Sequence, residues 1–168
     1  MTAPLVLTLV LGPDDQERLD ALRRSHFPPE RNQLQAHVTM FHALPGEHLP
    51  AVRDAVAQVC RRSPFAVPVT GVRSLGRGTA LTLAAPELTQ VRAELAREFS
   101  PWLTRQDAQR FNAHVTVQNF VTPDAARSLV ARLSQSFQPW AARATGVAVH
   151  RYLGGPWELL DEVAFAEV

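Results

Sequence analysis

The feature that most constrains this chain is a tripeptide that occurs twice, as His37-Val38-Thr39 and again 77 positions later as His114-Val115-Thr116. Each copy lies in a short run in which polar and apolar residues alternate. Side chains alternate faces along a β-strand, so the histidine and threonine of each copy share one face while the valine points to the other. The sequence therefore predicts two strands, at about 34–42 and 111–121, that each present an imidazole beside a hydroxyl.

Other segments repeat in step with the motif. Leu7-Thr8-Leu9 corresponds to Leu81-Thr82-Leu83, and Thr70-Gly71-Val72 corresponds to Thr145-Gly146-Val147. We interpret this as one ancestral unit, about half the chain long, that was duplicated and fused. A duplicated fold has an approximate twofold axis, which would bring the two histidines face to face and make them one site.

The pattern of apolar residues and turn residues predicts an α+β fold. Further strands are expected at about 4–11, 65–75, 79–84, 141–153 and 157–166, and helices at about 13–24, 47–62, 86–99 and 123–135. We expect a duplicated bilobal fold with two antiparallel sheets, helices on the outer faces, and a central cleft that carries both His-x-Thr motifs. Residues 1–168 are predicted to form a single domain with lobes at about 1–76 plus 157–168 and 77–156.

Composition excludes several classes of function. The formal net charge is +1, so broad polyanion binding is not expected, and affinity should come from a local cleft. The chain has no lysine, which excludes Schiff-base chemistry, and no paired-cysteine or His-Glu-x-x-His zinc motif. The single cysteine, Cys60, falls on an apolar helix stripe and is expected to be buried and inert. We expect a cytoplasmic enzyme with no cofactor, no metal, no membrane association and no obligate protein partner.

The paired motif, with a hydrophobic neighbour on each side of His-x-Thr, resembles the signature of the 2H phosphoesterase superfamily. The bacterial branch called 2′-5′ RNA ligase-like, or RNA 2′,3′-cyclic phosphodiesterase, is the most similar, and the likeness extends to the closing segment Tyr152–Trp157. The resemblance implies a bilobal α+β fold that opens 2′,3′-cyclic phosphates, with 2′-5′ RNA ligation as the reverse reaction in some members. It also implies catalytic roles for His37 and His114 and phosphate-binding roles for Thr39 and Thr116.

Neighbouring residues provide weaker candidates for substrate binding. Gln35 and Asn112 precede the two histidines by two positions and so share their face. Phe41 and Gln118 follow the threonines on that face, where Phe41 would stack a base and Gln118 would make polar contacts. Arg151 and Tyr152 lie on opposite faces of the strand at 141–153 and would reach phosphate or base. The unpaired histidines, His26, His42, His48 and His150, are interpreted as surface or packing residues.

Two histidines on opposite sides of a phosphorus atom can act as general base and general acid near neutral pH, because the ordinary pKa of histidine is about 6.5. The predicted partner is RNA with a 2′,3′-cyclic phosphate end, or a small cyclic nucleotide. The sequence does not say which histidine is the base. Two alternatives stay open: an RNA-end-binding module without turnover, and a 2H phosphodiesterase that acts on a small cyclic nucleotide or a 2′-5′ oligonucleotide.

Overall fold

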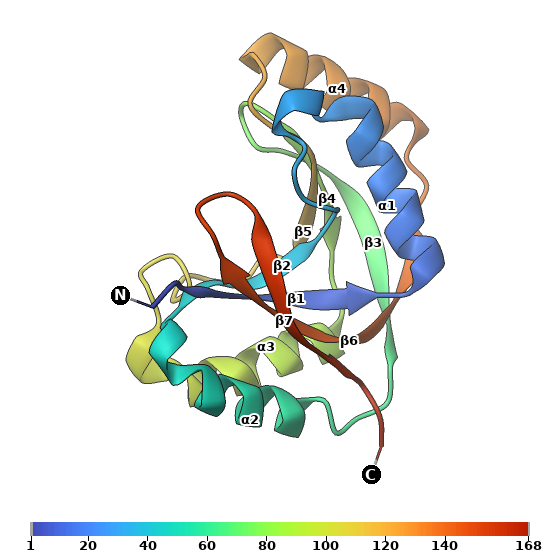
Figure 1. Ribbon diagram of the computed structural model, residues 1–168. Coiled ribbons are helices and arrows are strands. Elements are labelled where there is room, and N and C mark those ends of the chain that lie inside the picture. Colours follow the sequence, from blue (N-terminus) through green and yellow to red (C-terminus); the bar gives the residue numbers. More distant parts are fainter. Residues whose placement is uncertain (1, 168) are drawn as a thin grey trace.

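The computed structural model describes residues 2–167, so the two end residues of the predicted domain lie outside it. In this range each predicted helix and strand is present (Figure 1). The strands are β1 (Leu5–Leu11), β2 (Val38–Leu44), β3 (Phe65–Ser74), β4 (Thr79–Leu83), β5 (His114–Gln118), β6 (Trp140–Tyr152) and β7 (Trp157–Ala164). The helices are α1 (Pro13–His26), α2 (Leu49–Val59), α3 (Pro86–Glu98) and α4 (Pro123–Ser136).

The sheet is antiparallel throughout and closes into a ring. Its strand order is β1-β2-β5-β4-β3-β6-β7, and β6 also pairs with β1. The long strand β6 serves both halves, because its first residues pair with β3 and the rest pair with β1 and β7. The halves meet again where β2 and β5 share one pair, Val38 and Val115. The α+β class is confirmed, and the two expected antiparallel sheets are the two halves of this closed sheet.

The helices cover the outside of the ring in two pairs (Figure 1). Helix α1 packs on β5, and α4 packs on β3 and β4. Helix α2 contacts α3 and β7 at the other end of the molecule. Proline follows the N-cap residue of α4, Thr122, whose hydroxyl accepts a hydrogen bond from the Ala125 amide, as the sequence predicts for a helix start.

The core lies between these helices and the sheet. The valines of both motifs are fully buried there, together with Leu88, Val91 and Leu95 of α3. Burial of each such side chain stabilises the fold by about 1.5–3 kcal/mol. The apolar face of each motif strand is therefore held against helices, which leaves the polar face free for the cleft.

The elements do not divide at the predicted lobe boundaries of 1–76 plus 157–168 and 77–156. Strand β6, which the sequence placed in the second lobe, pairs with all of β1. Helix α1, which the sequence placed in the first lobe, packs on β5. The reason is that β6 is a continuous strand of 13 residues, long enough to form ladders with both halves.

The Leu-Thr-Leu match also needs a correction. Thr8 pairs with Thr39, whereas Thr82 pairs with His114. Relative to the two motifs, the Leu-Thr-Leu segments are therefore offset from each other by two residues. A shift of two keeps every side chain on the same face, which is why the pattern looked consistent.

Within residues 2–167, no helix combines the length and the apolar character that crossing a membrane requires.

Candidate active site

The two motifs meet at the pair formed by Val38 and Val115. Because the strands are antiparallel, this register places His37 opposite Thr116 and Thr39 opposite His114. All four side chains are half-buried, and alternation turns them to the face away from the core valines. Diagonal neighbours in such a ladder have side chains roughly 7–8 Å apart. The fold thus gathers the four motif residues into one place, with an imidazole at each end.

Both imidazoles are oriented in the same way by the backbone. Nδ1 of His37 lies 2.7 Å from the carbonyl oxygen of Gln35, and Nδ1 of His114 lies 2.9 Å from that of Asn112. A carbonyl only accepts, so each Nδ1 must carry the proton and donate it. The other nitrogen, Nε2, then holds the lone pair in the neutral ring. No hydrogen bond within residues 2–167 engages either Nε2, so both are available to a substrate.

On one side, His37 borders a cavity of about 350 Å³ that is partly aromatic. The Trp157 ring lies 4.7 Å from the His37 ring and 5.1 Å from the His150 ring, centroid to centroid. Nε2 of His150 is 3.0 Å from the hydroxyl of Thr8 on β1. Three elements, β1, β6 and β7, therefore enclose the imidazole of the first motif.

This enclosure has an electrostatic consequence for His37. Burial lowers the pKa of His37 from 6.5 to about 4. The hydrogen bond to the Gln35 carbonyl opposes this change, and the positive charges of Arg23, His150 and His114 add to it. His37 is therefore a neutral imidazole at neutral pH, with its lone pair facing the site.

On the other side, His114 and Thr39 border a cavity of about 320 Å³ with a different lining. His42, Arg73 and Arg110 also line it. The duplicated motif thus separates an aromatic half from a cationic half. Equivalent residues of the two repeats have unlike surroundings.

Comparisons with known proteins identify the family and the fold of the chain. A family model described as the 2′-5′ RNA ligase superfamily matches residues 11–156. The chain belongs to the 2′-5′ RNA ligase superfamily. The superfamily identification made from the motifs is confirmed, and the chain is a member of a superfamily of phosphoesterases and ligases.

Solved structures share the fold of this 2′-5′ RNA ligase superfamily member over its full length. TT0787 of Thermus thermophilus has a TM-score of 0.70 at 14% identity, covering 98% of each chain. LigT of E. coli, crystallised with 3′-AMP, has a TM-score of 0.67 at 16% identity, covering 99% of this chain and 100% of that one. A structure described as a phosphoesterase has a TM-score of 0.66 at 16% identity, with 99% and 100% covered. No curated protein matches the chain in sequence.

Two of the predicted substrate contacts are wrong for this superfamily member. Phe41 is fully buried and packs edge-on against Phe99 at 5.3 Å, so it cannot stack a base. Gln118 is buried as well, and its amide oxygen accepts a hydrogen bond of 3.0 Å from the Thr79 hydroxyl. The register of the sheet shifts near both residues, which turns them into the core.

The remaining predicted contacts fall at the edge of the site. The side chains of Gln35 and Asn112 are exposed, and their main role in the structure is played by their carbonyls, which orient the histidines. Arg151 lies 3.6 Å from Glu158 in an ion pair across the β6–β7 ladder. Tyr152 is 40% exposed at the end of β6, outside both motif cavities.

Sequence reasoning missed the partners of His37. His150 was interpreted as a surface or packing residue, but it lines the same cavity as His37. Trp157 was noticed only as part of the closing segment and was given no role. The signal that would have found them is the β1–β6 pairing, which joins residues more than 130 positions apart. His48 stacks on Trp102 at 4.1 Å, and Cys60 is buried with its pKa raised to about 11 by burial, both in agreement with the packing interpretation.

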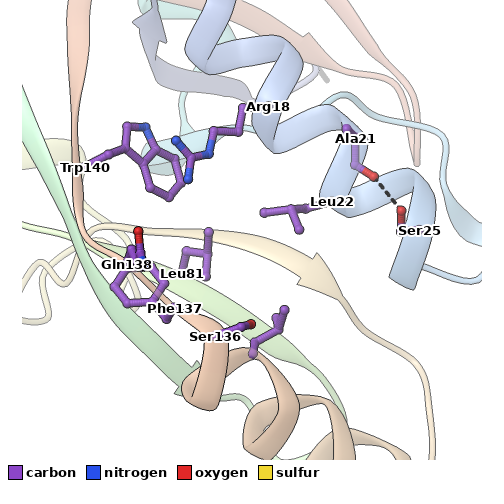
Figure 2. Close-up of a pocket in the computed structure, with 10 residues that line it drawn as sticks. Arg18, Ala21, Leu22, Ser25, Leu81, Ser136, Phe137, Gln138 and Trp140 are labelled. Atoms are coloured by element: carbon purple, nitrogen blue, oxygen red, sulfur yellow. Dashed lines mark hydrogen bonds between the residues drawn. The ribbon is translucent and has the colours of Figure 1, made fainter.

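A further cavity, of about 340 Å³, lies between α1 and α4 (Figure 2). There the Arg18 guanidinium lies 3.6 Å from the centroid of the Trp140 ring, and Leu22 points into the space. Leu81 forms part of its wall, next to Thr82, which pairs with His114. Adjacent strand residues point to opposite faces, so this cavity lies behind the sheet and is not part of the candidate site. Across residues 2–167, no three His, Cys, Asp or Glu side chains gather as a metal ion would require.

Proposed function

We propose that this protein is a phosphodiesterase that opens 2′,3′-cyclic phosphates, at RNA ends or on nucleotides. The observation that carries the proposal is the register at Val38 and Val115, which puts both His-x-Thr motifs on one face with each Nε2 free. His37 and His114 are the proposed acid–base pair. Thr39 and Thr116 are the proposed donors to the non-bridging phosphate oxygens.

The reaction needs one base and one acid on opposite sides of phosphorus. The base removes a proton from water as the water oxygen bonds to phosphorus. The bond from phosphorus to one ribose oxygen breaks, and the acid protonates that oxygen, which leaves a phosphomonoester and a free hydroxyl. When the 5′-hydroxyl of a second strand takes the place of water, the base removes its proton, its oxygen bonds to phosphorus and the 3′-oxygen leaves as a hydroxyl, which forms a 2′-5′ phosphodiester.

The unlike surroundings of the two histidines favour one direction of proton transfer. His37 is enclosed beside Trp157, and its pKa of about 4 keeps it neutral. A neutral imidazole with a free Nε2 accepts a proton, so we assign His37 as the base in hydrolysis. His114, which lines the cationic half of the cleft, is then the acid.

Trp157 takes the place proposed for Phe41 as the aromatic surface of the cleft. Its ring lies against His37, in the cavity that would hold the terminal nucleoside. Single-stranded RNA is commonly recognised by stacking of bases on aromatic side chains. The fold-level similarity to E. coli LigT, crystallised with phosphate and with 3′-AMP, supports a nucleotide-sized ligand in this cleft.

The test is a substrate panel measured in the presence and absence of a chelator. It contains 2′,3′-cyclic nucleotides, RNA with a cyclic phosphate end, and 2′-5′-linked dinucleotides. We expect phosphomonoester formation from the cyclic substrates at a rate that the chelator does not change. His48→Gln, a histidine outside both motif cavities, serves as the matched control.

The outcomes separate the alternatives. Tight binding of a cyclic-phosphate end without any turnover would favour an RNA-end-binding module. Turnover of the 2′-5′ dinucleotide alone would favour the oligonucleotide phosphodiesterase. Activity that is lost in chelator and restored by zinc would contradict the two-histidine mechanism.

A further inference from the structure

The cationic half of the cleft has a side-chain arrangement that the hydrolysis of a cyclic phosphate does not use. His42, at the outer part of β2, is held by Asp107, whose Oδ1 lies 3.0 Å from its Nδ1. The Asp107 side chain is almost fully buried, whereas that of His42 is 44% exposed. The ring is thus fixed from behind and presents its other edge to the cavity that it shares with His114.

Asp107 is an ionised anchor that is itself fully occupied. Its carboxylate accepts hydrogen bonds from the backbone amides of His42 and Ala43 as well as from the imidazole. Burial acts to raise the pKa of Asp107, but these hydrogen bonds outweigh it and bring the pKa below its ordinary value. The carboxylate is turned inward towards these donors. It therefore does not compete with an anion for the groups that line the cavity.

Three arginines also line the cavity, and one of them, the buried Arg92, donates to the backbone carbonyls of Met40 and Asp107. Arg73 near the end of β3 and Arg110 just before β5 are both exposed, and neither forms an ion pair with any carboxylate of residues 2–167. Both also border the next cavity along the surface, of about 510 Å³, whose lining contains no acidic residue. The opposite half of the cleft contains Glu162 and no arginine.

We propose that His42, Arg73 and Arg110 form a second phosphate subsite, which binds the 5′-phosphate of the nucleotide whose cyclic phosphate lies between the motifs. This inference rests on the proposed function and specifies its substrate. Arginine matches a phosphate with paired donors. The Nδ1–H of His42 is given to Asp107, so this ring adds a donor to the phosphate, from Nε2, in its protonated form. In RNA the bound group is the phosphodiester to the preceding nucleotide, and the cavity beyond the arginines continues the path of that strand.

The sharpest test compares two substrates that differ in one anion. These are adenosine 2′,3′-cyclic phosphate with a free 5′-hydroxyl and the same nucleotide with a 5′-phosphate. We expect kcat/KM to be about 10-fold higher for the 5′-phosphorylated substrate, the scale of a hydrogen bond to a charged group. A dinucleotide with a cyclic phosphate end shows whether a diester is accepted as well as a terminal phosphate.

The variants Arg73→Gln and Arg110→Gln should each reduce this ratio towards one, and His42→Gln should reduce it less. Arg73→Lys should retain part of the preference, because it keeps the charge and loses the paired donors. Arg97→Gln is the matched control, an exposed arginine on α3 that borders neither motif cavity. Its ratio should equal that of the unchanged protein.

The two proposals fail in different ways. If both substrates are hydrolysed equally well and the arginine variants change nothing, the subsite is overturned and the phosphodiesterase stands. If neither substrate is hydrolysed, calorimetric titration of the same pair decides. Tighter binding of the 5′-phosphorylated nucleotide that is lost in Arg73→Gln and Arg110→Gln supports the subsite without the activity, and equal binding overturns it.

Discussion

The two copies of the motif have the same backbone and different surroundings. In each, the histidine Nδ1 bonds the carbonyl two residues earlier, and the valine is buried. His37, however, is enclosed by Trp157 and His150, whereas His114 opens to a cavity lined by three arginines. We infer that duplication set the positions of the two histidines that we propose as the acid–base pair. Divergence of the neighbours, on β6, β7 and the segment before β5, gave the two positions different chemistry.

A repeated motif brings two like residues together, but it does not determine the surroundings of each. A symmetric pair of imidazoles can in principle transfer protons in either direction. An asymmetric environment favours one direction, and we propose that His37, which its lowered pKa keeps neutral, is the base. The contrast between the two halves can therefore be tested by changes that remove a motif residue, or that make the halves alike.

The largest effect is expected from loss of either histidine. His37→Ala and His114→Ala should each reduce turnover of a cyclic-phosphate substrate by about 10²-fold to 10⁴-fold, as loss of a general base or acid does. The double variant should be little slower than the slower single one, since the two groups act in one step. Steady-state kinetics measures this, and near-normal turnover of both single variants would refute the acid–base assignment.

Loss of a threonine hydroxyl should cost less. Thr39→Val and Thr116→Val retain the shape of a β-branched side chain and remove one donor to the phosphate. We expect kcat to fall by about 10-fold to 10³-fold with folding unchanged, the scale of one transition-state donor. Thr116 lies opposite His37 and Thr39 lies opposite His114, so kcat should fall in both variants. A change in KM alone would show that the hydroxyls bind the ground state only.

Much of the fold and the centre of the site were predictable from the sequence, for a definite reason. The motif strands alternate polar and apolar residues, and alternation alone determines which side chains share a face. Proline and glycine mark the ends of most elements, so each helix and strand was placed within a few residues. The candidate residues His37 and His114 could be singled out because their motif repeats.

The residues around the motifs were not predictable, because long-range pairing decides them. Trp157 and His150 reach His37 only through the β1–β6 and β6–β7 ladders. Strict alternation places Phe41 on the face of Thr39, but the irregular register of β1 and β2 buries it. His42 was interpreted as a surface or packing residue, since nothing local shows that Asp107, in a loop 65 positions away, binds its imidazole.

A smaller effect is expected from Trp157→Ala. Loss of a stacking surface should raise KM for a cyclic nucleotide by about 10-fold. The same change exposes His37 to water, so its pKa should rise from about 4 towards 6.5. The acidic limb of the profile of kcat/KM against pH should shift to higher pH together with this pKa, because that limb reports the base of the free enzyme. A limb that stays in place would mean that His37 is not the base.

The smallest effect concerns stability in acid. The folded protein binds a proton at His37 only near pH 4, whereas the unfolded chain binds one near 6.5. Unfolding therefore takes up a proton in this window, so the contribution of His37 to stability is complete above about pH 6.5 and is lost as pH falls towards 4. Burial is the main cause that keeps the ring neutral, and the positive charges of Arg23, His150 and His114 add to it. In His37→Gln the free energy of unfolding, measured with urea at several pH values, should fall less steeply between pH 6.5 and 4. His150, whose pKa burial also lowers, should leave a residual slope of the same sign in the variant. Equal slopes for both proteins would show that His37 is not held neutral by its surroundings, and the difference between the two halves of the cleft would then have to come from the arginines alone.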